Sequence, residues 1–191
     1  MTRFPLPFVF PFALLLAACA DTEEPVRFIT ATPDETARIT IPMQSVALRE
    51  VSLPAYATEE GIAIADASGA LTSAPDRIWA DDPTRAVTLR LTNALADLTG
   101  RVVASDPWPF RENPEATVEV RIEEFVAESA GRFVARGRIY VAQEVEGRND
   151  RAFSFTLAEP FAPEAGFPAI AAARSAVVSS LAREIAERGL R

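Results

Sequence analysis

The chain of 191 residues contains no histidine and only one cysteine, Cys19. These absences exclude zinc sites built from histidine and cysteine, and they exclude nucleophile systems of the Ser-His-Asp and Cys-His types. A single cysteine forms no disulfide bond within the chain, so packing has to stabilise the fold. Neither a Walker phosphate loop nor a G-x-G-x-x-G pattern occurs. We therefore expect no metal and no cofactor, and an enzyme of this sequence would depend mainly on carboxylates.

The chain also lacks lysine, so all 19 of its basic residues are arginines. They are outnumbered by 27 acidic residues, and the formal net charge is −8 at pH 7. Residues 19–191 hold 18 of the arginines and all 27 acids, which gives 18 − 27 = −9. A surface of this sign repels nucleic acid and provides no polybasic patch for a membrane. Nucleic-acid partners are therefore not expected.

The first 18 residues have the pattern of a secretory signal. Arg3 is the only charged residue before Asp21, and the stretch from 8 to 16 is apolar apart from Pro11. A membrane-spanning helix needs about 20 apolar residues, whereas this run is shorter and interrupted by proline. We predict that residues 1–18 are a cleaved signal peptide.

The end of this segment resembles the lipobox of bacterial lipoproteins, since Leu16, Ala17 and Ala18 directly precede Cys19. Small residues before the cut allow the chain to lie extended in a signal peptidase, and the thiol then takes a diacylglyceryl group. The alternative is an ordinary signal-peptide cleavage with a chance cysteine nearby. Because the sole cysteine stands at the one position that the pattern demands, we interpret Cys19 as a lipidation site.

Lipidation at Cys19 would place the domain at a membrane surface. One acyl chain binds only marginally, but bacterial lipoproteins carry two or three, so a stable anchor is expected. Ala20 follows the cysteine, where an aspartate would favour retention in the inner membrane. We expect an outer-membrane anchor with the domain on the periplasmic face.

Residues 19–44 are acidic and interrupted by prolines, which favours a lipidated N-terminus and a tether. A short strand at 26–29 fits within this segment. The 173 residues that follow the predicted signal peptide are enough for one domain with a sizeable core, which we place at residues 45–191. Short strands are predicted at 45–53, 62–65 and 101–104.

The clearest helix signal lies between Asp82 and Gly100. Asp82 can cap a helix, Pro83 suits the first helical position, and Gly100 suits the position after the last turn. Apolar residues recur between them at helical spacing: Val87, Leu91, Leu95 and Leu98. The pattern predicts one helix from Pro83 to the residue before Gly100.

Alternating apolar and polar residues predict an antiparallel meander of strands at 117–126, 133–141 and 153–157. An apolar stripe at 168–188 predicts a second helix that covers the apolar face of this meander. Together the patterns predict an α/β fold. We expect a single domain with a mixed, largely antiparallel sheet of five or six strands, flanked by two main helices.

Trp79 and Trp108, the latter close to Phe110, are candidate contact residues. Together they could form an aromatic surface for a protein partner or a lipid. The alternative is that these rings close an edge of the core, as aromatic side chains near helix starts and strand ends often do.

A group of glutamates, including Glu119, Glu123 and Glu124, lies on one predicted strand, with Arg136 and Arg138 on its neighbour. Two of the glutamates could serve as the acid and base of a hydrolase. The alternative is ion pairing across the solvated face of the sheet. We favour the ion pairs because no flanking feature indicates a cleft.

The order and spacing of short motifs resemble the family of ABC-type transport auxiliary lipoproteins, the PqiC-like group, over about residues 45–188. The landmarks are Val51-Ser52-Leu53-Pro54 with Tyr56, Ile62 to Ala65, Ile78-Trp79-Ala80-Asp81 with Pro83, the helix through Leu95 to Gly100, Pro107-Trp108, Glu123 to Phe125, Arg132 to Val141, and a last helix with Ser175 and Ile185.

The resemblance implies a function that the residues alone do not. Lipoproteins of this family accompany transport systems with MCE-domain proteins, which move lipids between the two membranes and in some cases include an ABC permease and ATPase. The resemblance implies a non-enzymatic accessory subunit at the outer-membrane end of such a system, contributing to envelope integrity. It also implies a fold similar to the TolB N-terminal domain and assembly into a homo-oligomeric ring.

Two other classes of function stay open at this point. One is a lipoprotein that regulates or binds another envelope machine, such as a peptidoglycan synthase. A long linker would favour that class, and the predicted tether is short for it. The other is a glycan hydrolase that uses only carboxylates, which would need two acidic side chains facing each other across a cleft.

Overall fold

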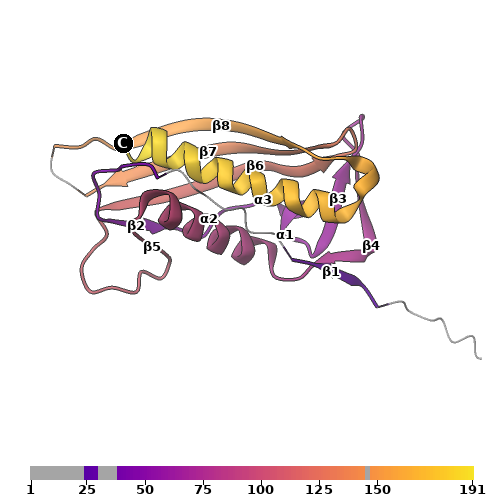
Figure 1. Cartoon of the computed structure of the whole chain (residues 1–191), viewed down its shortest axis with the longest axis horizontal. Coiled ribbons are helices and arrows are strands. Elements are labelled where there is room, and N and C mark those ends of the chain that lie inside the picture. The colour runs from indigo at the N-terminus through magenta and orange to yellow at the C-terminus, as the bar shows by residue number, and fades with distance from the viewer. Residues whose placement is uncertain (1–23, 30–37, 145–146) are drawn as a thin grey trace, which may run out of the picture.

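The computed structural model describes residues 24–29, 38–144 and 147–191. In these residues, one mixed sheet carries two long helices on one of its faces (Figure 1). The strands are β1 (Val26–Phe28), β2 (Ser45–Leu48), β3 (Gly61–Ala65), β4 (Leu71–Trp79), β5 (Val102–Ser105), β6 (Ala116–Glu128), β7 (Arg132–Gln143) and β8 (Arg151–Pro160). The helices are α1 (Ala55–Thr58), α2 (Pro83–Thr99) and α3 (Phe167–Glu184). A 3₁₀ turn (Pro163–Ala165) precedes α3, and a π-helical turn (Ile185–Gly189) continues it.

The predicted α/β class, the single domain and the two main helices are confirmed, but the predicted number of strands is wrong. The described residues form an eight-stranded sheet. The prediction missed β4 because this strand is largely exposed, contains Pro75 and shows no apolar alternation. Its pairing with β3 on one side and β1 on the other holds it in the sheet. The prediction also missed the single helical turn α1.

Strand β6 organises the sheet. One of its edges pairs with the antiparallel β7 along nearly its whole length, and β7 pairs in turn with β8. The other edge is divided between two shorter groups of strands: β2 and then β5 pair with its beginning, whereas β3, β4 and β1 follow from its end. The two groups therefore lie at opposite ends of the molecule (Figure 1).

The ends of α2 agree with the predicted caps. The backbone N–H of Arg85 donates to Oδ1 of Asp82 at 2.7 Å, and Pro83 occupies the first turn. At the other end, Gly100 has a φ of 64°, and its N–H donates to the carbonyl oxygen of Ala96 at 2.8 Å. Glycine adopts this left-handed conformation without the steric cost of a side chain.

A bulge in β6 keeps the apolar residues on one face. Val118, Val120 and Ile122 are buried at alternate positions, and unbroken alternation would place Glu124 beside them. The register shifts between Ile122 and Glu124, so that Phe125 and Ala127 continue the buried face instead.

The residue opposite this bulge is Gly137. A Cβ atom there would collide with the backbone of Arg121, so the close approach of the two strands requires glycine.

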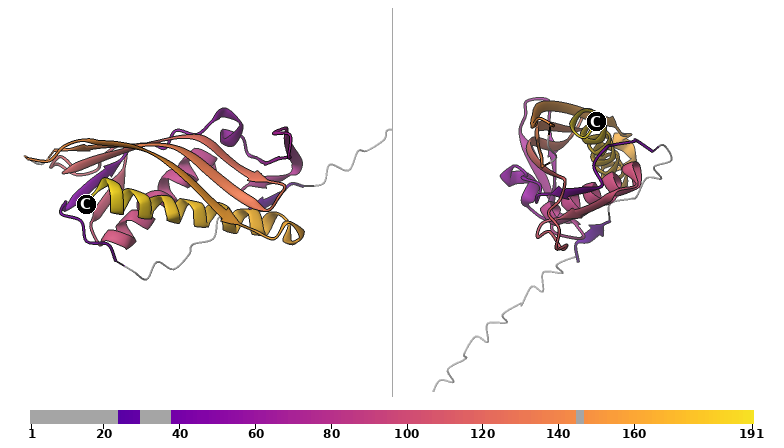
Figure 2. Two further views of the ribbon diagram at one scale, coloured as in Figure 1. Left: turned by 90° about the horizontal axis from the view of Figure 1, so that it is seen from above. Right: turned by 90° about the vertical axis from the view of Figure 1, so that its left-hand side faces the viewer.

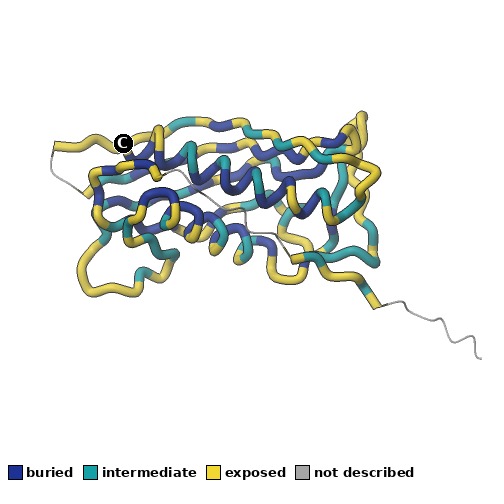
Figure 3. Tube along the Cα trace, in the orientation of Figure 1, coloured by how far each residue is buried: buried dark blue, intermediate teal, exposed yellow. Residues whose placement is uncertain are grey.

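The helices cover the concave side of the curved sheet, as the two views in Figure 2 show. In α2, exposed residues recur at helical spacing among buried ones, whereas α3 is mostly buried or half-buried (Figure 3) and packs against β7, β8 and α2. The stripe predicted for the last helix is buried: Ile170, Ala173, Val177, Leu181 and Ile185.

Part of the predicted tether belongs to the folded domain. Strand β1 pairs with β4, and Ile39, Ile41 and Met43 are buried in the core. The domain therefore begins before residue 45, where the sequence pattern had placed its start. The acidic composition of residues 19–44 did not indicate this, because only three apolar residues at alternate positions pack the segment against the core. At the end of α2, the N–H of Ile39 donates to Leu98 O at 2.7 Å.

Within the described residues, no helix combines the length and apolar character needed to cross a bilayer.

Candidate functional site

The predicted lipidation site, Cys19, and the predicted peptidase recognition residues Leu16, Ala17 and Ala18 lie outside the described residues. Their assignment stays a prediction from the sequence.

Trp79, the first candidate contact residue, is a core residue. It ends β4, and only 8% of it is exposed. Its ring lies under the guanidinium of Arg174 from α3, with 4.1 Å between Arg174 Cζ and the ring centroid. The ring therefore closes the core where β4, α2 and α3 meet.

Trp108, the second candidate, lies in the loop that follows β5 and is half-buried. Its Nε1–H donates to Glu112 O at 2.7 Å, and its ring meets that of Phe110 edge-on at 5.1 Å between centroids. Phe110 is 54% exposed. With Val102, 49% exposed on the edge strand β5, these rings line a hollow of about 450 Å³.

The two tryptophans do not form one surface. Trp79 belongs to the end of the molecule formed by β1, β3, β4 and the start of α2, which we call the Trp79 end. Trp108 belongs to the end formed by β2, β5 and the loop after it, which we call the Trp108 end. A joint aromatic surface is therefore excluded by the topology, and each tryptophan has to be considered separately.

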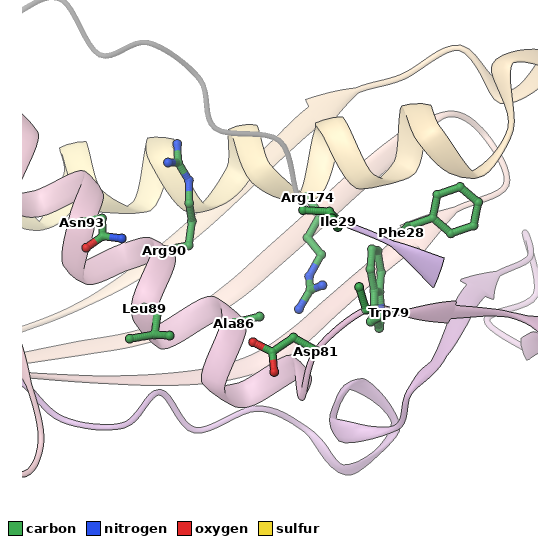
Figure 4. Close-up of a pocket in the computed structure, with 10 residues that line it drawn as sticks. Phe28, Ile29, Trp79, Asp81, Ala86, Leu89, Arg90, Asn93 and Arg174 are labelled. Carbon is green, nitrogen blue, oxygen red and sulfur yellow. The ribbon is translucent and has the colours of Figure 1, made fainter. Parts of the chain in front are cut away.

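An open groove of about 470 Å³ lies at the Trp79 end between β1, β4, α2 and α3 (Figure 4). Apolar side chains line much of it, among them Phe28, Ile29, Trp79 and Leu89. Ile29 is 82% exposed and Leu89 38% exposed, so apolar surface here lies open to solvent. Such patches on a protein surface commonly mark a binding site.

The lining also includes charged groups. Asp81 lies at the end of the groove near the start of α2, and its carboxylate is paired with Arg85, one turn further along the helix. Arg90 lines the other end and donates from Nη2 to Ser179 Oγ at 2.9 Å.

Arg174 is the unusual group of this site. It extends from α3 toward Trp79 and Asp81 (Figure 4), although only 2% of the residue is exposed. Its Nη2 donates to Pro83 O at 3.3 Å, and its Cζ lies 5.6 Å from the centroid of Phe125 in addition to its contact with Trp79. A guanidinium has five N–H donors, so a single hydrogen bond leaves most of its donors available.

Burial lowers the pKa of Arg174 to about 10 by desolvating its charged form. The side chain is therefore still a cation at neutral pH. Among the residues that the structure describes, no carboxylate forms an ion pair with it. The attraction of the two aromatic faces, roughly 2 kcal/mol for a desolvated site, offsets only part of the cost of burying an unpaired charge.

The sequence contained a signal for Arg174 that the prediction did not use. The residue lies four positions after Ile170 and three before Val177, within the apolar stripe of α3. A charged residue on the buried face of a helix requires a reason, because charged side chains are almost never fully buried without a partner. Phe28 and Leu89 had no comparable feature in the sequence that would have marked them as groove residues.

The carboxylates on the outer face of the sheet form ion pairs. Glu124 and Arg136 pair across the strands at 3.4 Å, as predicted. Glu119 pairs instead with Arg121 at 2.6 Å and Arg49 at 3.1 Å, because the strand register places it opposite Tyr140 rather than an arginine. Glu119 therefore belongs to a surface ion-pair network, which is the alternative that we favoured over a hydrolase pair.

The groove at the Trp79 end is suited to binding. Its lining combines apolar surface with the desolvated cation of Arg174, an arrangement that can hold an apolar group bearing a negative charge. Within the described residues, no cluster of three or more acidic, histidine or cysteine side chains could hold a metal ion.

Two solved structures resemble this fold closely. One is the crystal structure of an uncharacterised protein, with a TM-score of 0.64 and 18% identity over 86% of this chain and 97% of that one. The other is a Xanthomonas campestris protein of the DUF330 family, with a TM-score of 0.62 and 17% identity over 87% of this chain and 92% of that one. At these identities the similarity shows the fold alone. PelC from Paraburkholderia phytofirmans, solved as a dodecamer, is more distant, with a TM-score of 0.43 and 13% identity over 81% of this chain and 95% of that one.

A comparison with curated proteins gives no significant match. The sequence profile of the family described as "ABC-type transport auxiliary lipoprotein component" matches residues 28–186. This range includes α1, α2 and α3 and every strand except the first residues of β1. The chain therefore belongs to the family of ABC-type transport auxiliary lipoproteins.

Proposed function

We propose that this chain is an outer-membrane-anchored periplasmic lipoprotein and a non-enzymatic accessory subunit of an MCE-type intermembrane lipid transport system. The observation that carries the proposal is the family match over residues 28–186, which makes the chain an auxiliary component of transport. An auxiliary component needs an anchor and binding surfaces rather than catalytic groups.

The N-terminal sequence supports the membrane anchor. Cys19 follows Leu16, Ala17 and Ala18, and it is the only cysteine of the chain. Strand β1 begins at Val26, seven positions after Cys19. Seven extended residues span at most about 25 Å, so a lipid on Cys19 would hold the Trp79 end of the domain close to the membrane.

The exposed aromatic residues at the Trp108 end support a protein contact there. Trp108, Phe110 and Val102 form an apolar patch beside the edge strand β5, far from the Trp79 end. Aromatic side chains of this kind are common at the centres of protein interfaces. A domain anchored near its Trp79 end would present this patch toward the periplasm and its partner.

The experiment is a crosslinked affinity purification of the tagged lipoprotein from its own membranes, with mass spectrometry of the captured proteins. We expect an MCE-domain protein, with or without an ABC permease and ATPase. Recovery of cell-wall synthases or secretion proteins without any MCE-domain protein would contradict the proposal and favour a regulator of another envelope machine.

Cys19→Ala tests the anchor in the same system. Without the thiol, lipidation cannot occur, so we expect loss of the protein from the outer-membrane fraction and increased sensitivity of the cells to detergent. Ser129→Ala is a suitable control, since it changes a small exposed side chain in the turn between β6 and β7 and leaves the lipobox intact. Normal detergent resistance of the Cys19→Ala cells would argue against a role in envelope integrity.

A further inference from the structure

We propose that the groove at the Trp79 end binds an anionic lipid. Its acyl chain would lie along Phe28, Ile29 and Leu89, and a headgroup oxygen would accept hydrogen bonds from the guanidinium of Arg174. The proposal rests on the proposed function only for the source of the lipid, the membrane to which Cys19 would be anchored.

Arg174 has N–H donors that form no hydrogen bond with the described residues. The side chain is a buried cation with one hydrogen bond, from Nη2 to Pro83 O. No hydrogen-bond acceptor for its Nε or Nη1 lies among the described residues. Because Arg174 lines the groove, an anion placed there would satisfy these donors.

The charges that line the groove favour an anionic ligand. Asp81, the acidic residue of the lining, is already paired with Arg85 on the solvent side of α2. Arg174 has no carboxylate partner among the described residues, so a net positive charge remains in a desolvated position. An anionic ligand is therefore favoured over a neutral or cationic one.

The apolar lining of the groove favours a lipid over a peptide. A bound peptide brings an amide group with every residue, and each buried amide needs a hydrogen-bond partner. Most of the lining residues are apolar, and Ile29 and Leu89 among them are exposed to solvent. An acyl chain covers such a surface without polar groups of its own, and the short connection to Cys19 keeps the groove near the bilayer.

Trp79 provides a fluorescent probe inside the groove, since the chain has only two tryptophans. The experiment uses the full mature lipoprotein carrying Trp108→Phe, reconstituted in phosphatidylcholine vesicles. Dibrominated phosphatidylglycerol, which quenches tryptophan on contact, is compared with dibrominated phosphatidylcholine at the same mole fraction. Because both lipids surround the anchor equally, the difference between them reports selective binding of the anionic lipid.

We expect saturable quenching of Trp79 by phosphatidylglycerol at concentrations about tenfold lower than by phosphatidylcholine. Arg174→Met should remove this preference, because methionine fills the space without a charge. Arg138→Gln is the matched control: it also removes one arginine, but from the exposed outer face of β7, and should keep the preference. Unfolding curves of both variants establish that each is folded.

Equal quenching by the two lipids, or an unchanged preference in Arg174→Met, would overturn the proposal. Quenching by neither lipid, with Trp79 becoming shielded only when a protein partner is added, would also overturn it and assign the groove to a protein. None of these results depends on which transport proteins are captured from the membranes, so failure of the lipid site and failure of the proposed function are distinguishable.

Discussion

Trp79 and Trp108 have similar neighbours in the sequence, since each stands within a few residues of a proline and an aspartate, yet they occupy opposite environments. Trp79 ends a strand that has a neighbour on each side, and α3 covers its ring with Arg174. Trp108 follows the edge strand β5 and lies in a loop, where its ring contacts Phe110 and stays half-buried. The elements that pack against a side chain, rather than its local sequence, therefore decide whether the side chain is buried in the core or lies at the surface.

The two ends also differ in what they offer a ligand. The Trp79 end presents a groove with a buried cation, whereas the Trp108 end presents the exposed ring of Phe110 beside the half-buried ring of Trp108. We therefore expect substitutions at the Trp79 end to change stability and lipid binding, and substitutions at the Trp108 end to change protein capture.

The largest effect is expected for Trp79→Ala. The substitution removes a buried ring and leaves Arg174 without its closest aromatic contact, so it should destabilise the fold by about 3–5 kcal/mol. Urea unfolding of the mature chain measures this loss. Trp79→Phe keeps a ring and should lose less, and a loss below about 1 kcal/mol for Trp79→Ala would show that the ring is not part of the core.

A smaller effect is expected for Asp82→Ala, which removes the N-cap of α2 at the Trp79 end. The N–H of Arg85 would lose its acceptor, at a cost of about 0.5–2 kcal/mol. Asp97→Ala is the control, because Asp97 is exposed near the other end of the same helix. An acidic residue there opposes the helix dipole, so its removal should be neutral or slightly stabilising. Equal losses for both variants would contradict the assigned cap.

Trp108→Ala should affect stability less than Trp79→Ala does. It removes the edge-on ring contact with Phe110, which contributes about 0.5–1.5 kcal/mol to stability, and one hydrogen bond to Glu112 O at the surface. We expect its main effect on the crosslinked capture of the transport partner, which should fall while the unfolding curve stays close to that of the unaltered chain. Unchanged capture would exclude Trp108 as a contact residue.

The smallest effect is the pH response of the β3–β4 turn. Hydrogen bonds from the Ser68 hydroxyl and from the N–H groups of Ala70 and Ser68 lower the pKa of Asp66. A lowered pKa means that this carboxylate stabilises the fold above its unfolded pKa of about 4, and that the contribution is lost as the pH falls through the folded value. Thermal unfolding between neutral pH and pH 3 should therefore show a slightly weaker acid dependence for Asp66→Asn. An identical dependence would show that the turn contributes nothing.

The sequence by itself determined the elements whose signals are local. Asp82, Pro83 and Gly100 mark the ends of α2 because caps act within one turn of the helix. The alternation in β6, β7 and β8 predicted a sheet with one apolar face because neighbouring side chains point to opposite faces of a strand. The motif order also identified the family, which the profile match confirms.

Only the tertiary structure decided the rest. Strand β4 forms because β1 and β3 pair with it on either side. The bulge between Ile122 and Glu124 forms because Gly137 allows β6 and β7 to approach closely. The groove likewise unites Phe28, Trp79, Leu89 and Arg174 from four separate elements. No local pattern predicts that these four residues lie together, because strand pairing and burial depend on contacts between segments that are distant in the sequence.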